Sequence, residues 1–139
     1  MSKLIAVQGC TIKYDLPEDP GGQVVLVATV TPASSKVKAG GAAAYKDKIS
    51  IVVASGTVTV TQPPEGCASQ GVVPPGTIDI SGTSQKATTE GQSFVLAEDE
   101  GDATFECVFP LSSGTGTKPG DVKIRAKVTA AGQNVTKAT

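Results

Sequence analysis

The chain of 139 residues contains no histidine and no tryptophan, and its aromatic residues are two tyrosines and three phenylalanines. Without histidine, the Ser-His-Asp and Cys-His arrangements of nucleophilic catalysis cannot form. A zinc site that uses histidine is excluded for the same reason. No glycine-rich loop leads into a helix that could bind phosphate, and no carboxylate pair is spaced for acid–base chemistry. We therefore expect a protein that is not an enzyme.

Long hydrophobic runs and an excess of one charge are also missing. No stretch approaches the roughly 20 apolar residues that cross a bilayer as a helix, so we expect no membrane span. The apolar run at residues 4–7 ends at Gln8 and Gly9 and is too short for a signal peptide, which predicts synthesis in the cytoplasm. Twelve basic and 13 acidic side chains leave a net charge of -1. Nucleic acid is therefore not an expected partner.

The residues that are abundant favour β-strands. Valine, isoleucine, threonine and serine occur in short runs that are partly alternating, a pattern typical of half-buried strands. The chain has the length of one domain, which we expect to span residues 1–139. Strands are predicted at Gln23–Val30, Ile49–Val53, Gly56–Thr61, Thr77–Ile80, Ser93–Leu96, Ala103–Phe109 and Asp121–Val128.

Helices are not predicted anywhere in the chain. The best helical candidate, residues 39–48, contains Gly40 and Gly41, which together cost about 2 kcal/mol relative to alanine in a helix interior. We therefore predict a hairpin there. Segments rich in proline and glycine separate the predicted strands, as turns do. The predicted fold class is all-β.

An internal repeat is indicated by three segments in which a lysine is followed five residues later by a glycine. They are Lys36–Gly41, Lys86–Gly91 and Lys127–Gly132. A Pro-Gly pair and a β-branched run precede each one, and a single cysteine opens each unit. The order Cys, Pro-Gly, Lys, Gly thus occurs three times. It predicts three unequal hairpin-type units, at approximately residues 10–66, 67–106 and 107–139.

Two architectures are compatible with such a repeat. In the first, the three units are arranged with pseudo-threefold symmetry as a small tapered cone, so that one chain can dock on a symmetric homotrimer. In the second, glycine and proline only mark the turns of a β-sandwich, which would serve as a binding module or decorate a capsid or other particle.

The repeated segments resemble a known family. Residues 34–41, 84–91 and 126–133 are similar to the hairpins of PAAR and PAAR-like spike-tip proteins, and residues 6–12 resemble the start of PAAR-like chains. The resemblance implies a structural protein that caps the trimeric β-helical spike of a contractile injection machine, such as a phage tail or a type VI secretion system, and aids envelope piercing. It implies one copy per homotrimeric spike and incorporation into a virion or injection particle.

The three cysteines are the candidate metal ligands that the repeat predicts. Cys10, Cys67 and Cys107 occur once per unit, so they could converge on the pseudo-threefold axis as three thiolates that bind zinc or iron. The alternative is three buried thiols that act as small apolar residues. An odd number of cysteines without a secretion signal does not indicate a disulfide framework.

An acidic stretch at residues 98–102 has the carboxylates that calcium prefers, but it lacks the twelve-residue spacing of a calcium-binding loop. We interpret it as a solvated turn between the strands at Phe94 and Phe105. Glu18 and Asp19, which lie between prolines, are interpreted as part of an exposed loop.

Overall fold

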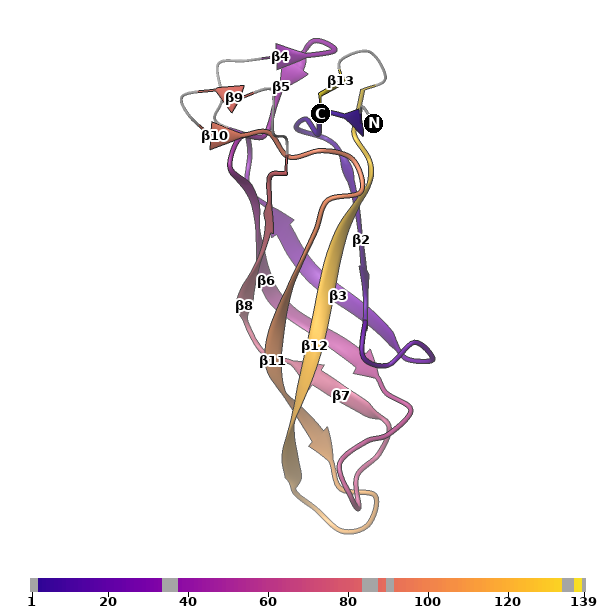
Figure 1. The fold of residues 1–139 in the computed structure, drawn as a ribbon. Helices are drawn as coiled ribbons and strands as arrows, with labels where there is room; N and C mark the ends of the chain where they lie inside the picture. Colours follow the sequence, from indigo (N-terminus) through magenta and orange to yellow (C-terminus); the bar gives the residue numbers. More distant parts are fainter. Residues whose placement is uncertain (1–2, 34–37, 84–87, 90–91, 134–136, 139) are drawn as a thin grey trace.

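The computed structural model describes residues 3–33, 38–83, 88–89, 92–133 and 137–138. These residues form strands and turns and contain no helix, which confirms the predicted all-β class (Figure 1). The strands are β1 (Lys3–Leu4), β2 (Thr11–Asp15), β3 (Gln23–Val30), β4 (Lys38–Ala39), β5 (Ala42–Ala43), β6 (Lys48–Thr59), β7 (Gln70–Val73), β8 (Gly76–Ser81), β9 (Thr88–Thr89), β10 (Gln92–Ser93), β11 (Glu100–Pro110), β12 (Thr117–Ala130) and β13 (Lys137–Ala138).

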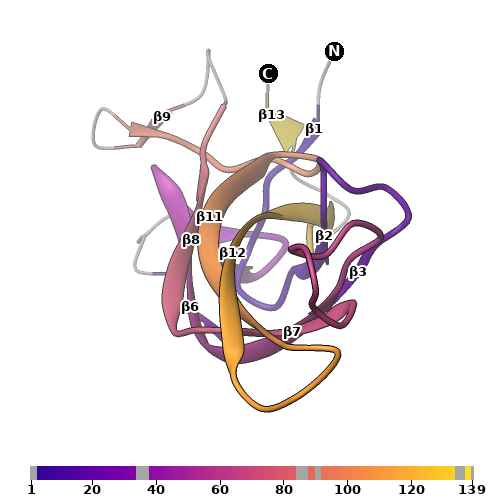
Figure 2. The same cartoon turned by 90° about the horizontal axis from the view of Figure 1, so that it is seen from below.

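The longer strands form one seven-stranded sheet that wraps into a nearly closed, barrel-like structure (Figure 2). The strand order is β2-β12-β11-β7-β6-β3, and β8 pairs with the first half of β6. Strands β2 and β3, at the two ends of this order, contact each other. One sheet therefore surrounds the core, in place of the two packed sheets that a β-sandwich would have.

Close packing between β8 and β11 completes the wall. A side chain at Gly101 of β11 would place its first carbon 1.8 Å from the carbonyl oxygen of Asp79 in β8. The ring of Phe105 similarly occupies the space where a side chain at Gly76 would lie. Glycine at residues 76 and 101 lets the two strands approach more closely than larger residues would.

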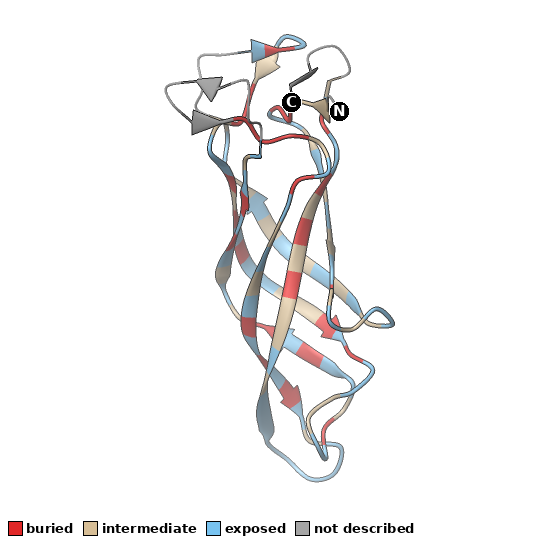
Figure 3. Ribbon diagram, viewed as in Figure 1, coloured by how far each residue is buried: buried red, intermediate tan, exposed pale blue. Residues whose placement is uncertain are grey.

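The core lies inside the wrapped sheet because apolar residues alternate along its strands (Figure 3). In β8, Ile78 and Ile80 are fully buried while the residues between them are exposed, and β11 and β12 show the same alternation. Full burial of one such side chain contributes about 1.5–3 kcal/mol to stability. The largest fully buried side chains are Phe109, Ile49, Ile51, Ile78, Ile80, Ile124, Val7, Val53, Val58, Val73, Val95 and Val128.

The strand predictions agree with the structure where alternation is regular and differ where bulges occur. The predicted strand Gln23–Val30 coincides with β3. Residues 49–53 and 56–61, predicted as two strands, belong mainly to the single strand β6, which contains a register shift opposite Val27 and Ala28. Strands β2 and β7 were not among the predicted strands.

Candidate functional site

Three short segments at one end of the barrel exchange backbone hydrogen bonds in a closed ring. The N–H of Tyr45 donates to the carbonyl oxygen of Ala6 (3.0 Å), the N–H of Ala6 donates to that of Val95 (2.8 Å), and the N–H of Val95 donates to that of Tyr45 (3.0 Å). Each of the three residues therefore donates one bond and accepts one bond. The pattern is therefore cyclic, and it joins three parts of the chain that are far apart in sequence.

The residues on either side of this ring repeat the same cyclic order. The residue before the ring position in one segment forms a β-bridge with the residue after it in another, in the pairs Ile5–Leu96, Ala44–Val7 and Phe94–Lys46. Two further bonds follow the order, from the N–H of Gln8 to Ala43 and from the N–H of Ala97 to Leu4. The ring segments, Ile5–Val7, Ala44–Lys46 and Phe94–Leu96, are thus equivalent in their pairing.

A short antiparallel strand pair stands immediately before each ring segment. The pairs are β4–β5, β9–β10 and β1–β13. The pair β4–β5 is a local hairpin over residues 38–43, so only the first part of the hairpin predicted at residues 39–48 is confirmed, and residues 44–48 lead through the ring segment into β6. The third joins the two ends of the chain, as Figure 1 shows. We call these three pairs and the three ring segments the cap.

The side chains of the cap divide between two apolar clusters. The ring residues Ala6, Tyr45 and Val95 are buried in the main core of the barrel. The flanking residues form a second cluster above it, which consists of Ile5, Val7, Ala39, Ala44, Phe94 and Leu96. The Tyr45 hydroxyl donates to the carbonyl oxygen of Thr31 (2.9 Å), which joins the ring to the segment after β3. The cap is therefore packed on both sides of the hydrogen-bonded ring.

The structure assigns the third copy of the repeat differently from the sequence. Lys127 lies within β12, and Gly132 follows the end of that strand, so neither belongs to the third strand pair of the cap. That pair is β1–β13. Lys36, Lys86 and Gly91, which define the first two predicted hairpins, lie outside the described residues.

Each ring segment leads through a turn into a strand of the barrel. Positive φ angles occur in these turns at Gly9 (95°), Asp47 (65°) and Glu98 (73°). The strands that follow are β2, β6 and β11. Two of the turns are closed by a bond from residue i+3 to residue i, Cys10 to Val7 and Asp99 to Leu96, whereas the turn at Asp47 is one residue shorter and is closed by a bond from Lys48 to Lys46.

The acidic stretch at residues 98–102 contains a structural carboxylate that sequence reasoning did not identify. Asp99 is 6% exposed and is the only charged residue that is buried among the described residues. Its carboxylate accepts bonds from the N–H of Leu96 (2.8 Å) and from the N–H (3.2 Å) and hydroxyl of Thr83. It therefore fixes the third turn below the ring, while Glu100 to Asp102 lie in β11 and are not part of a solvated turn.

The three cysteines are not gathered into one site. Cys10 lies beside the cap, and its backbone nitrogen would be 3.1 Å from a Cβ atom placed on Gly132. Cys107 lies inside the barrel in β11, opposite Gly120 of β12. Cys67 pairs with Leu111 through a backbone β-bridge near the opposite end of the molecule. They form no disulfide, and the described residues contain no group of three or more Cys, Asp or Glu side chains able to hold a metal ion.

Burial also disfavours the thiolate form that a metal would require. Loss of solvent, followed by the negative charge of Asp121, raises the pKa of Cys107 to about 11, and burial raises the pKa of Cys10. Zinc or iron binding by Cys10, Cys67 and Cys107 stays a prediction from the sequence. Metal analysis of the wild type beside a triple Cys→Ser variant tests it.

Comparison with known proteins adds no relative, because no family model, curated protein or solved structure matches this chain. Within the described residues, no helix is long and apolar enough to cross a membrane. The functional argument therefore rests on the geometry of the cap.

Proposed function

We propose that this protein is a spike-tip protein that caps the homotrimeric β-helical spike of a contractile injection machine and aids envelope piercing. The observation that carries the proposal is the ring of backbone hydrogen bonds through Ala6, Tyr45 and Val95. A single chain with three equivalently paired segments can match a threefold-symmetric surface, which most monomers cannot do without leaving two of the three partner sites unfilled.

The cap is the end that we assign to the spike. It carries the three strand pairs and is the wider end of the molecule, whereas the opposite end narrows to the turn between β11 and β12 (Figure 1). Three short pairs around one axis can each contact one spike subunit. One copy per trimer follows from this geometry, and the narrow end would then point toward the target envelope as part of a virion or injection particle.

The role of the protein in this proposal is mechanical. The wrapped sheet and the two apolar clusters connect the cap to the narrow end through continuous strands such as β11 and β12. Axial load applied at the cap is therefore carried along hydrogen-bonded strands. No catalytic residue is needed for this role.

The test is reconstitution with the homotrimeric spike protein that the proposal requires. Native mass spectrometry of the co-purified complex should give one copy of this protein for every three spike chains. Absence of a complex, or equal numbers of the two chains, would overturn the proposal.

The orientation is tested by photocrosslinking. Lys38 is exposed on β4 in the cap, and Lys118 is exposed at the narrow end. With p-benzoylphenylalanine in place of Lys38, irradiation should crosslink the protein to the spike. The same substitution at Lys118 is the matched control and should give no crosslink. Crosslinking from residue 118 and none from residue 38 would contradict the proposed seating.

A further inference from the structure

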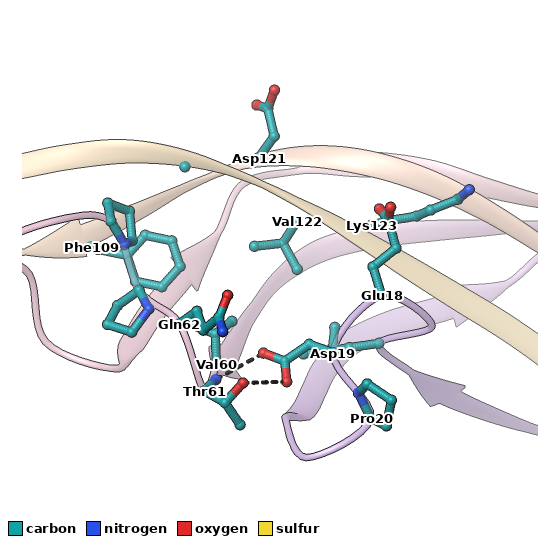
Figure 4. A pocket seen from close by; sticks show the side chains of 14 residues that line it. Glu18, Asp19, Pro20, Val60, Thr61, Gln62, Phe109, Asp121, Val122 and Lys123 are labelled. Carbon is teal, nitrogen blue, oxygen red and sulfur yellow. Dashed lines mark hydrogen bonds between the residues drawn. The ribbon is translucent and has the colours of Figure 1, made fainter.

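A pocket of about 530 Å³ opens in the wall of the barrel, and Figure 4 shows it from close by. It lies between the loop at residues 16–22, the segment at residues 60–64 and strand β12. Apolar side chains line its interior, and Figure 4 shows Val122 pointing into it. These apolar residues are Leu16, Val60, Phe109 and Val122, with Pro20, Pro63 and Pro64 at the walls.

The pocket coincides with an unpaired edge of β12. On one side, β12 pairs with β11 from Thr117 to Lys127. On the other side, it pairs with β2 only from Arg125 to Ala130, because β2 ends at Asp15. In the part of the chain that the structure describes, no strand pairs with this second edge in the part of β12 that precedes Arg125 in the sequence. We call this edge, residues 119–123, together with the pocket, the seam.

Backbone groups of Asp121 and Lys123 face the open edge. In an antiparallel strand, alternate residues bond to alternate neighbours. Val128 bonds to the β11 side, through its N–H to Asp99 and its carbonyl oxygen to Glu98. The odd-numbered residues of β12 therefore direct their N–H and C=O groups to the β2 side. At residues 121 and 123 this side is the seam.

Pro119 supports the same assignment. The Pro-Gly pair at residues 119–120 was predicted to break the chain before a strand, yet both residues lie inside β12. Proline has no N–H and is tolerated in a strand where that group would face an unpaired edge. Residue 119 has the parity that faces the seam. Its missing N–H therefore removes no bond to β11.

The outer face beside the seam is short of positive charge. Asp121 lies directly opposite Glu106 of β11, and like charges in such a pair are unfavourable. Neither carboxylate has an ion-pair partner among the described residues. The nearby Lys123 is 3.8 Å from Asp102. Glu18 and Asp19 add two further carboxylates on the loop side of the pocket.

We propose that the seam binds an extended segment of a partner protein as an added β-strand. The open edge of β12 supplies backbone bonds, the pocket takes apolar side chains on the inner face, and the carboxylates favour lysine or arginine on the outer face. The segment therefore alternates apolar and basic residues. About five residues of the edge are open, which corresponds to a strand of roughly 17 Å.

This site is separate from the surface assigned to the spike. The cap is formed by backbone pairs at the wide end, whereas the seam lies along the side wall, so both can be occupied in the same molecule. The seam does not depend on the spike-tip proposal. It assigns the protein a second, peptide partner.

The test uses a fluorescein-labelled peptide of alternating lysine and valine, titrated with the full-length protein by fluorescence polarisation. We expect saturable binding. The corresponding glutamate–valine peptide should not bind. A lysine–valine peptide with N-methyl groups on every second residue keeps the charge but loses donors for strand pairing, and it should bind at least about tenfold more weakly.

Two matched double variants locate the site. Glu18→Gln with Asp121→Asn removes two negative charges at the seam, and Glu98→Gln with Asp79→Asn removes two elsewhere on the surface. The seam variant should weaken binding about fivefold, the size expected for two exposed charge pairs, while the other variant should leave it unchanged.

Three results would overturn the proposal. They are no binding of the lysine–valine peptide at millimolar protein, equal affinity of the N-methylated peptide, and equal weakening by the two double variants. The last two would indicate adsorption by charge alone. Because spike binding is measured separately by native mass spectrometry, failure at the seam is distinguishable from failure of the cap.

Discussion

Lys3 and Ala138 lie directly opposite each other in the antiparallel pair β1–β13, so the two ends of the chain together complete the cap. Ile5, which directly follows β1, forms a β-bridge with Leu96. The carbonyl oxygen of Ile5 accepts a hydrogen bond from the side-chain amide of Gln133 (2.9 Å). The third cap unit is therefore assembled from residues at the beginning and the end of the sequence.

The first prediction concerns circular permutation. A short flexible linker that joins residue 139 to residue 1, with new ends between Ser113 and Gly114, should preserve the fold because the new break lies in an exposed turn. We expect the melting temperature to stay within about 5 °C of the wild type. Circular dichroism on heating measures this.

A second permutant is the control for the first. New ends between Tyr45 and Lys46 would interrupt the ring of hydrogen bonds and the core contact of Tyr45. This permutant should lose cooperative unfolding. Equal stability of the two permutants would contradict the structural role assigned to the ring.

The next prediction concerns Asp99. In Asp99→Asn, one carboxylate oxygen is replaced by an amide that donates, so either the buried N–H of Leu96 or the partly buried hydroxyl or N–H of Thr83 loses its acceptor. The free energy of unfolding should fall by about 1–3 kcal/mol. Urea denaturation measures the change. Asp102→Asn, on the exposed face of β11, is the control and should change stability by less than about 0.5 kcal/mol.

Asp19 predicts a pH dependence of stability. The backbone N–H of Thr61 donates to its carboxylate (2.8 Å), as does the Thr61 hydroxyl (2.7 Å), and these bonds lower the pKa of Asp19 below its ordinary value of 3.8. A lowered folded-state pKa gives stabilisation that is complete above the unfolded pKa and is lost as the pH falls through the folded pKa.

The measurement is the melting temperature between pH 2 and pH 7 for the wild type and Asp19→Asn. The difference between them should be constant above about pH 5 and should shrink below pH 4 as the wild-type carboxylate is protonated. A difference that grows toward low pH would show that the sign is wrong. Glu18→Gln is the control on the same loop.

Thiol accessibility gives a further prediction. Cys107 is fully buried with a raised pKa, Cys67 is 8% exposed, and Cys10 is partly exposed. At pH 8, Ellman's reagent should therefore react within minutes with at most one thiol of the folded protein, and with all three in denaturant. Fast reaction of two or more thiols before unfolding would contradict the placement of Cys67 and Cys107.

Alternation of small apolar and polar residues was enough to predict β3 and most of β8, β11 and β12, because one face of each strand is buried and the other is wet. It failed for β2 and β7, which are short and contain Tyr14 or Gly71 in place of a long β-branched run. Sequence reasoning also predicted a break at Pro119. Proline is tolerated there because that edge of the strand is unpaired, and whether an edge is paired depends on the neighbouring strands and not on the local sequence.

The sequence by itself determined that the protein is all-β, because its short β-branched runs alternate with polar residues and are separated by proline and glycine. Only the tertiary structure decided which segments are equivalent. A repeat search compares side chains in chain order, so it cannot recognise a unit whose halves are β1 and β13. The ring through Ala6, Tyr45 and Val95 is made by backbone groups, which every residue type carries, so no sequence motif marks it.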